Sequence, residues 1–185
     1  MPDSTAIRRL KDGDIGGLEV LIARYEVKAV RTAFFIVHDG QLAEDIAQEA
    51  FLRVYQRIRG FDETRPFEPY LMRSVINLAL NAAEQRSRTI SLDLDGDGEC
   101  VERLLSQAAS VESQVEFSQL KSELLEALSK LPPRQRAAIV QRYYLEMSEA
   151  EMASALEAAP GTVKWLLNAA RTRLRTLLSS QRSAE

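Results

Sequence analysis

Apolar residues recur every three or four positions along most of this 185-residue chain, which is the spacing of amphipathic helices. The clearest helix is predicted from Gln41 to Arg59, where acids, amides and arginines fill the polar face. Its core face is predicted to comprise Ala43, Ile46, Ala47, Ala50, Phe51, Val54 and Ile58. The spacing also predicts helices over residues 14–37, 69–86, 112–129 and 134–144, whereas residues 1–13 are predicted to be a frayed lead-in. Runs of β-branched residues are nearly absent, so the predicted fold is all-α.

Residues 148–178 predict a helix-turn-helix. A short helix over residues 149–156 precedes a break at residues 157–159, and Pro160 suits the first turn of a longer helix. The longer helix has an apolar stripe made of Val163, Leu167, Ala170, Leu174 and Leu177. Basic residues lie mostly off that stripe, namely Lys164, Arg171, Arg173 and Arg175. The pattern suits a DNA groove, but an ordinary helical hairpin with solvated arginines fits it equally well.

The formal net charge of −3 is unevenly distributed along the chain. Residues 1–88 carry 13 basic and 13 acidic side chains, residues 89–128 carry 2 and 9, and residues 129–185 carry 9 and 5. Helical spacing is also lost from Ser87 to about Val111, where acids and glycines gather. We therefore predict two small helical domains, residues 1–88 and 112–185, joined by a flexible acidic linker at residues 89–111.

Several kinds of site are disfavoured by composition. The acidic stretch that opens at Asp93 resembles a calcium loop, but its twelfth position is Leu104, where a bidentate glutamate is required. One cysteine and one histidine exclude an internal disulfide and disfavour a zinc site. The histidine, His38, falls in a turn and is expected at the surface. Because no combination of nucleophile, base and metal ligands appears, we predict no enzyme activity and no cofactor.

Apolar stretches are short throughout the chain. The longest, from Ala33 to Val37, is far below the length that spans a bilayer, and no signal peptide opens the sequence. We therefore expect a cytoplasmic protein without membrane insertion.

Two groups of motifs go beyond helical spacing. The N-terminal group is AEDIAQEAFLRVY (residues 43–55), then Phe61, Phe67, YLMR (70–73) and NLA (77–79). The C-terminal group is LSKLPPRQ (128–135), RYY (142–144), SEAEMASAL (148–156), GTVK (161–164) and ARTRL (170–174). In this order, the groups resemble the second and fourth domains of the extracytoplasmic-function (ECF) sigma factors, over roughly residues 12–178. These bacterial initiation factors recruit RNA polymerase to promoters.

The resemblance implies core RNA polymerase and promoter DNA as partners, and it allows an anti-sigma factor as a third. The helix at residues 41–59 would dock on a coiled coil of the polymerase's largest subunit. The polymerase-binding residues implied there are Asp45, Gln48, Glu49, Phe51, Leu52 and Arg53. The loop between Phe61 and Phe67 and the helix after it would bind a flipped base of the −10 element. Its DNA-binding candidates are Arg65, Tyr70, Arg73, Asn77 and Asn81. The second helix of the helix-turn-helix would enter the −35 major groove, with Thr162, Lys164, Asn168 and Arg171 as DNA-binding candidates.

The C-terminal motifs depart from the family pattern in three places. Trp165 and Leu166 stand where side chains would face solvent or DNA, Ala169 replaces a common arginine, and the turn glycine expected near Glu157 is absent. Three interpretations remain open for Trp165 and Leu166. The promoter affinity is altered, or the two residues form an apolar patch for a protein partner, or they pack within the chain itself.

The resemblance leads us to predict a sigma factor that directs promoter recognition and transcription initiation. One alternative is a DNA-binding regulator that never engages polymerase. Another is an interaction protein descended from sigma factors that sequesters a partner and forms no active holoenzyme.

Overall fold

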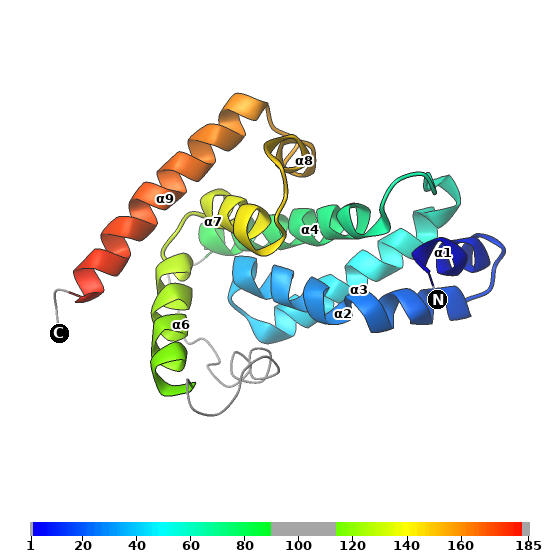
Figure 1. Ribbon diagram of the computed structural model, residues 1–185, viewed down its shortest axis with the longest axis horizontal. Coiled ribbons are helices and arrows are strands. Elements are labelled where there is room, and N and C mark those ends of the chain that lie inside the picture. Colours follow the sequence, from blue (N-terminus) through cyan, green and yellow to red (C-terminus); the bar gives the residue numbers. More distant parts are fainter. Residues whose placement is uncertain (1, 90–113, 183–185) are drawn as a thin grey trace.

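The computed structural model of the protein describes residues 2–89 and 114–182, and every regular element in these ranges is helical (Figure 1). The elements are α1 (Asp3–Lys11), α2 (Gly16–Val37), α3 (Gly40–Arg57), the 3-10 turn η1 (Ile58–Gly60), α4 (Phe67–Thr89), α6 (Gln114–Ser129), α7 (Pro133–Ile139), the π-helical turn η4 (Val140–Tyr144), α8 (Glu149–Ala155) and α9 (Pro160–Arg182). The all-α prediction is confirmed. Apart from Thr89, the predicted linker and its Asp93 loop lie outside the described residues.

Helices α2, α3 and α4 form the body of an N-terminal helix group, and all seven apolar residues predicted for the core face of the helix at residues 41–59 are buried, with Ile58 in η1 and the others in α3. The start of α3 is fixed by Asp39, whose Oδ1 accepts a hydrogen bond from the Leu42 backbone N–H at 2.9 Å. Arg86 Nη2, from the far end of α4, donates to Asp39 Oδ2 at 2.6 Å. Arg86 therefore has a structural role in linking α4 to the N-terminus of α3.

The prediction that residues 1–13 are frayed is wrong, because α1 packs across the end of α2 with Ala6, Ile7 and Leu10 buried. Gly17 makes this close approach feasible, since a Cβ at this position would lie 2.3 Å from the Ala6 carbonyl oxygen. Asp3 adds polar contacts to Arg24 and to the Tyr25 hydroxyl of α2. Such a short helix is stable because of its tertiary packing, which helical spacing alone does not reveal.

Helices α6 to α9 form a C-terminal helix group that contains the predicted helix-turn-helix. Ser148 begins α8 with a capping box, in which Ser148 and Glu151 each accept a backbone N–H of the other. The turn between α8 and α9 includes Glu157, whose φ of 49° lies in the left-handed region where glycine is favoured. The absence of the expected glycine therefore leaves a glutamate in a strained backbone conformation.

The two helix groups share one apolar core, and α7 lies against both α2 and α4 (Figure 1). Buried Arg136 of α7 crosses the boundary, because its guanidinium donates to the carbonyl oxygens of Leu128, Ser129, Leu131 and, across the boundary, Ile36. These carbonyls lie at or near the C-terminal ends of α6 and α2, where unpaired acceptors favour a cation. Arg136 thus joins the ends of two helices from different groups.

His38 was expected at the surface, but its side chain is half-buried and its Nε2 atom is covered. The residue ends α2 in a left-handed conformation, with φ 55°, and its ring centroid lies 6.0 Å from that of Phe34. Burial, with a smaller repulsion from the Arg136 guanidinium, lowers the pKa of His38 from 6.5 to about 3. The side chain is covered because the C-terminal helix group packs over the end of α2, as the Phe35–Tyr144 ring contact at 5.0 Å also illustrates.

Candidate functional site

An apolar groove of about 550 Å³ runs between α2 and α3. Its apolar lining comes from Leu18, Ile22, Val27, Val30, Ala47, Phe51 and Leu52, and its polar lining comes from Glu26, Glu44 and Gln48. Leu52 is 49% exposed beside it. A groove with an apolar floor and carboxylates at its edge suits a helix that carries both apolar and basic side chains.

The structure distributes the six predicted polymerase-binding residues of α3 unevenly. Asp45, Gln48, Leu52 and Arg53 are exposed, whereas Glu49 is half-buried and accepts from Arg53 Nε at 2.7 Å. Phe51 is only 4% exposed, so most of its side chain belongs to the core. Its ring lines the floor of the groove. The α2 side of the groove was missed by the sequence analysis.

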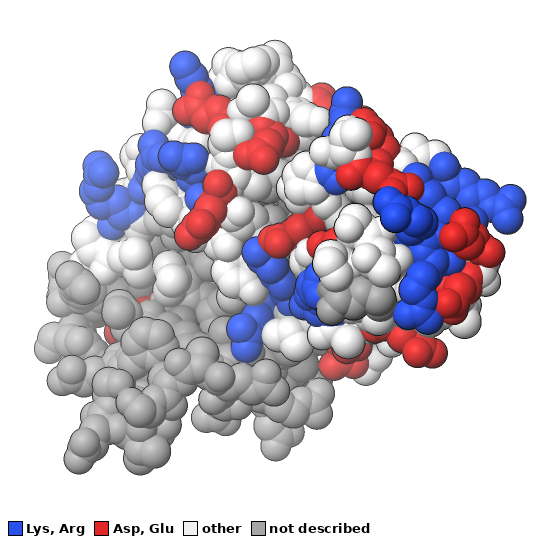
Figure 2. Space-filling view, turned by 45° about the vertical axis from the view of Figure 1, so that its right-hand side comes forward, with Lys and Arg blue, Asp and Glu red and all other residues white. Residues whose placement is uncertain are grey.

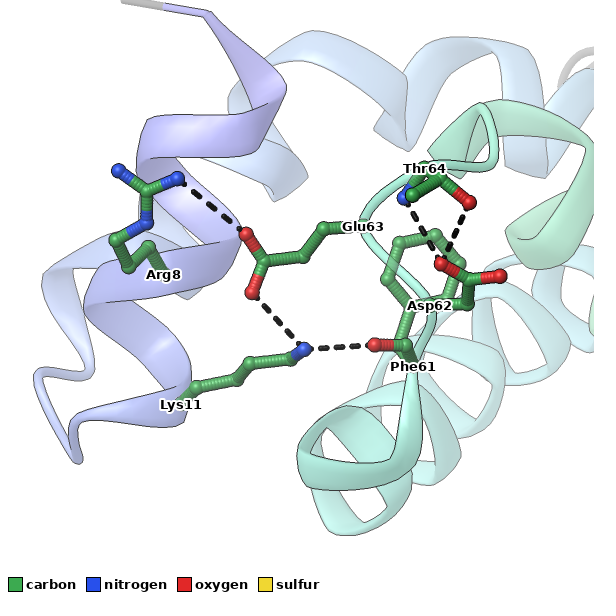
Figure 3. Close-up of polar contacts among 6 residues, drawn as sticks. All are labelled: Arg8, Lys11, Phe61, Asp62, Glu63 and Thr64. Carbon is green, nitrogen blue, oxygen red and sulfur yellow. Dashed lines mark hydrogen bonds and ion pairs between the residues drawn. The ribbon is translucent and has the colours of Figure 1, made fainter.

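The predicted promoter-reading loop between Phe61 and Phe67 is held by α1 (Figure 3). Lys11 Nζ donates to the Phe61 carbonyl oxygen at 2.7 Å and to Glu63 Oε1 at 3.0 Å, and Arg8 Nη2 lies 3.6 Å from Glu63 Oε2. The hydrogen bond from Lys11 is the main cause that lowers the pKa of Glu63. The hydrogen bonds from the Thr64 hydroxyl and backbone N–H are the main causes that lower the pKa of Asp62. Helix α1, missed at the sequence level, therefore positions this loop.

Aromatic rings anchor both ends of that loop. Phe61 and Phe67 are buried with centroids 5.8 Å apart, and the half-buried Tyr70 ring lies 4.9 Å from that of Phe61.

Charges around the loop are paired, and on the face shown in Figure 2 basic and acidic side chains interleave instead of separating into patches of one sign.

A second pocket of about 550 Å³ lies beside the loop and the start of α4. Three predicted −10 residues line it together, namely Arg65, Tyr70 and Arg73. Asn77, which is half-buried, and Asn81, which is exposed, lie further along α4 and outside this lining. Arginines beside an aromatic ring can bind a nucleotide through its phosphate and its base.

Helix α8 closes one side of this pocket. Glu151 and Ser154 contribute to the lining, and Arg73 donates to Ser154 Oγ at 3.4 Å and to Glu157 Oε1 at 3.2 Å. The Glu157 carboxylate therefore accepts a hydrogen bond from Arg73 of the kind that a DNA phosphate oxygen could accept. This contact joins a predicted −10 residue to the turn of the helix-turn-helix, and no pattern in the sequence predicts it.

All four predicted −35 residues, Thr162, Lys164, Asn168 and Arg171, are exposed on α9. Lys164 Nζ lies 3.8 Å from Glu149 Oε2 of α8. Arg171 is held against Tyr143, with Nε donating to the hydroxyl at 2.9 Å and the guanidinium 5.8 Å from the ring centroid.

The predicted patch of Trp165 and Leu166 divides between two environments. Leu166 is 4% exposed and belongs to the core, which agrees for this residue with the interpretation that it packs within the chain. Trp165 is 63% exposed. Successive residues of an α-helix are rotated by 100°, so Leu166 points into the core while its neighbour Trp165 points outward.

Other kinds of site were also sought in the described ranges. Within residues 2–89 and 114–182, no three His, Cys, Asp or Glu side chains are placed to hold a metal ion. None of the helices described there combines the length and the apolar character that crossing a membrane requires.

Comparison with known proteins identifies both helix groups. Residues 21–89 match the family described as sigma-70 region 2, and residues 121–174 match that described as sigma-70, region 4. An RNA polymerase sigma-E factor of Streptomyces avermitilis is 31% identical over 169 residues, covering 91% of this chain and 89% of that protein. The ECF RNA polymerase sigma factor SigW of Bacillus subtilis is 29% identical over 176 residues, covering 93% of this chain and 94% of that protein.

Two solved structures have a similar fold. One is CnrH in complex with the cytosolic domain of CnrY, with a TM-score of 0.65 and 21% identity over 96% of this chain and 97% of that chain. The other is the sigma factor RpoE in complex with the anti-sigma factor NepR from Bartonella quintana, with a TM-score of 0.63 and 19% identity over 87% and 96%. The chain belongs to the ECF sigma factors, which direct RNA polymerase to promoters in transcription initiation.

Proposed function

We propose that this sigma factor docks on core RNA polymerase through the α2–α3 groove, binds the −10 element in the pocket beside α4, and reads the −35 element with α9. Residues 1–88 and 112–185 would act as two domains joined by the linker at residues 89–111. The chain would act in the cytoplasm as a binding protein, and polymerase would supply the catalytic chemistry.

The observation that carries the proposal is the pairing of an apolar groove on one helix group with a basic recognition helix on the other. The groove offers apolar contacts through Leu52 and Val27, both exposed, and Asp45 and Gln48 lie on the same helix as Leu52. Apolar contacts supply binding energy, and the carboxylates select a basic partner helix. An anti-sigma factor that used this groove would compete with polymerase.

For the −10 element, Tyr70 would stack on an unpaired base, while Arg65 and Arg73 would bind phosphates. Asn77 and Asn81 would extend the contact along α4. Arg73 must first exchange Glu157 and Ser154 for DNA. Because an exposed ion pair is worth only about 0–1 kcal/mol, this exchange costs little.

For the −35 element, the exposed Thr162, Lys164, Asn168 and Arg171 would contact bases and phosphates in the major groove. The sequence of α9 supports this assignment, because residues 160–182 include five basic residues and no acid. Phosphate contacts by these cations would make binding fall steeply with salt.

The test is run-off transcription from a library of bacterial promoter fragments, with core polymerase supplied with or without the full chain. We expect discrete transcripts that require the chain and whose start sites share two upstream elements. With Arg65→Ala, the chain should still bind core polymerase but should yield fewer open complexes. If the chain forms no complex with core polymerase, or forms one that starts no transcript, the proposal is contradicted.

A further inference from the structure

We propose that Trp165 determines part of the −35 specificity by packing against the C5-methyl group of a thymine. This inference rests on the proposed placement of α9 in the major groove. It goes beyond that placement because it names one base and one functional group that the helix selects.

The position of Trp165 on α9 directs its indole away from the protein. Val163, Leu166 and Leu167 are buried in the core, and at 100° per residue Trp165 lies nearly opposite the centre of that buried face. Figure 1 shows α9 along the outer edge of the molecule, with the other described helices of its group on one side. The 63% exposure of Trp165 follows from this geometry.

The surroundings of Trp165 favour DNA over a protein partner. A protein-binding patch needs several contiguous apolar side chains, but Leu166 is buried and is not part of this surface. The exposed residues within four positions of Trp165 are Gly161, Thr162, Lys164 and Asn168. With five basic residues and no acid between residues 160 and 182, the helix that carries Trp165 is complementary to a polyanion.

The chemistry of the major groove then selects the contact. Base edges there present hydrogen-bond donors and acceptors, and thymine alone adds a methyl group. Trp165 lies in the second turn of α9, and the N-terminal part of a recognition helix is the part that meets base edges. An exposed indole at this position gains most by covering the methyl group, since this removes apolar surface of both partners from water.

The experiment uses holoenzyme, made of core polymerase and the full chain, and a promoter recovered by run-off transcription whose −35 segment is randomised. Wild-type holoenzyme should select a thymine at one position. Replacing that thymine by deoxyuridine, which lacks only the methyl group, should weaken binding about fourfold, the value of one buried methyl group. With Trp165→Ala, the preference at this position should disappear and deoxyuridine should have no effect, whereas Trp165→Phe should keep both.

A matched control is Ile15→Ala, which truncates another exposed apolar residue in the other helix group and should leave the selected sequence unchanged. The proposal is overturned if Trp165→Ala selects the same sequence with the same sensitivity to deoxyuridine. It is also overturned if this variant keeps its DNA preference and loses a protein partner. If wild-type holoenzyme fails to assemble or selects no −35 sequence, the proposed function fails first, which is a separate result.

Discussion

Two surfaces of the N-terminal helix group differ in whether the rest of the chain covers them. The α2–α3 groove is open, with Leu52 49% exposed at its edge. The pocket beside α4 is bordered by Glu151 and Ser154 of α8, and Arg73 is paired with Glu157. The lining of the groove contains no arginine or lysine that a carboxylate of the other helix group could pair, whereas the pocket offers Arg73, which Glu157 pairs.

This difference implies an order of events under the proposed function. Polymerase can dock on the groove without any rearrangement of the described helices. DNA contact by Arg73 requires α8 and its turn to release this arginine. The stability of the contact between the helix groups should therefore affect DNA binding more than polymerase binding.

The largest expected effect on the contact between the two helix groups comes from Arg136→Met. This change leaves four carbonyl oxygens, including that of Ile36, without their buried donor. Because each unpaired buried acceptor is costly, we expect the free energy of unfolding to fall by about 3 kcal/mol in urea titrations.

The control is Arg134→Met on the same helix. Arg134 is more exposed and lies 3.3 Å from Glu84, a surface ion pair whose loss should change the free energy of unfolding by about 0.5 kcal/mol. Equal losses in the two variants would show that Arg136 does not join the helix groups as described.

Most of the helices could be predicted from the sequence, whereas the contacts between the two helix groups could not. Helices α2, α3, α4 and α9 follow from local apolar spacing, and the exposed −35 residues follow from the polar face of α9. The contact of Arg136 with the carbonyl of Ile36, 100 residues away in the sequence, has no local pattern. The burial of His38 likewise depends on the packing of the other helix group. Helix α1 was not predicted because it is stabilised by packing against α2. This packing depends on Gly17, where a Cβ would collide with the Ala6 carbonyl oxygen.

A second prediction uses His38, the one histidine in the chain, as a reporter of the same boundary. Its folded-state pKa is about 3 against an ordinary value of 6.5, so below pH 6.5 the unfolded chain gains a proton that the folded chain does not. The free energy of unfolding should therefore be highest above pH 6.5 and should fall by up to about 1.4 kcal/mol per pH unit below it.

The measurement is urea unfolding from pH 7 to pH 5, with His38→Asn as the control. Asparagine accepts the left-handed backbone at this position and does not titrate, so its curve should be flatter over this interval. Parallel pH dependence in the two proteins would refute the burial of His38.

The smallest expected effect comes from Glu157→Gly. Glycine adopts the φ of 49° without strain, and the loss of the carboxylate leaves Arg73 without its partner Glu157. We therefore expect the holoenzyme to bind promoter DNA about two- to fivefold more tightly in a filter-binding measurement. Glu146→Gly is a matched control, because Glu146 also has a positive φ, 56°, and carries the same charge, but it precedes α8. An equal gain in both variants would assign the effect to charge or backbone strain and not to Arg73.

The central claim is that the open groove is the docking surface for polymerase, and the most direct measurement is the affinity of core polymerase for two leucine variants. Leu52→Asp places a charge at the groove, whereas Leu124→Asp places one on α6, at a leucine of similar exposure, 43% against 49%. We predict that Leu52→Asp weakens binding at least about 100-fold, as expected for a central apolar contact, and that Leu124→Asp weakens it less than about twofold. Equal affinities for the two variants would contradict the account.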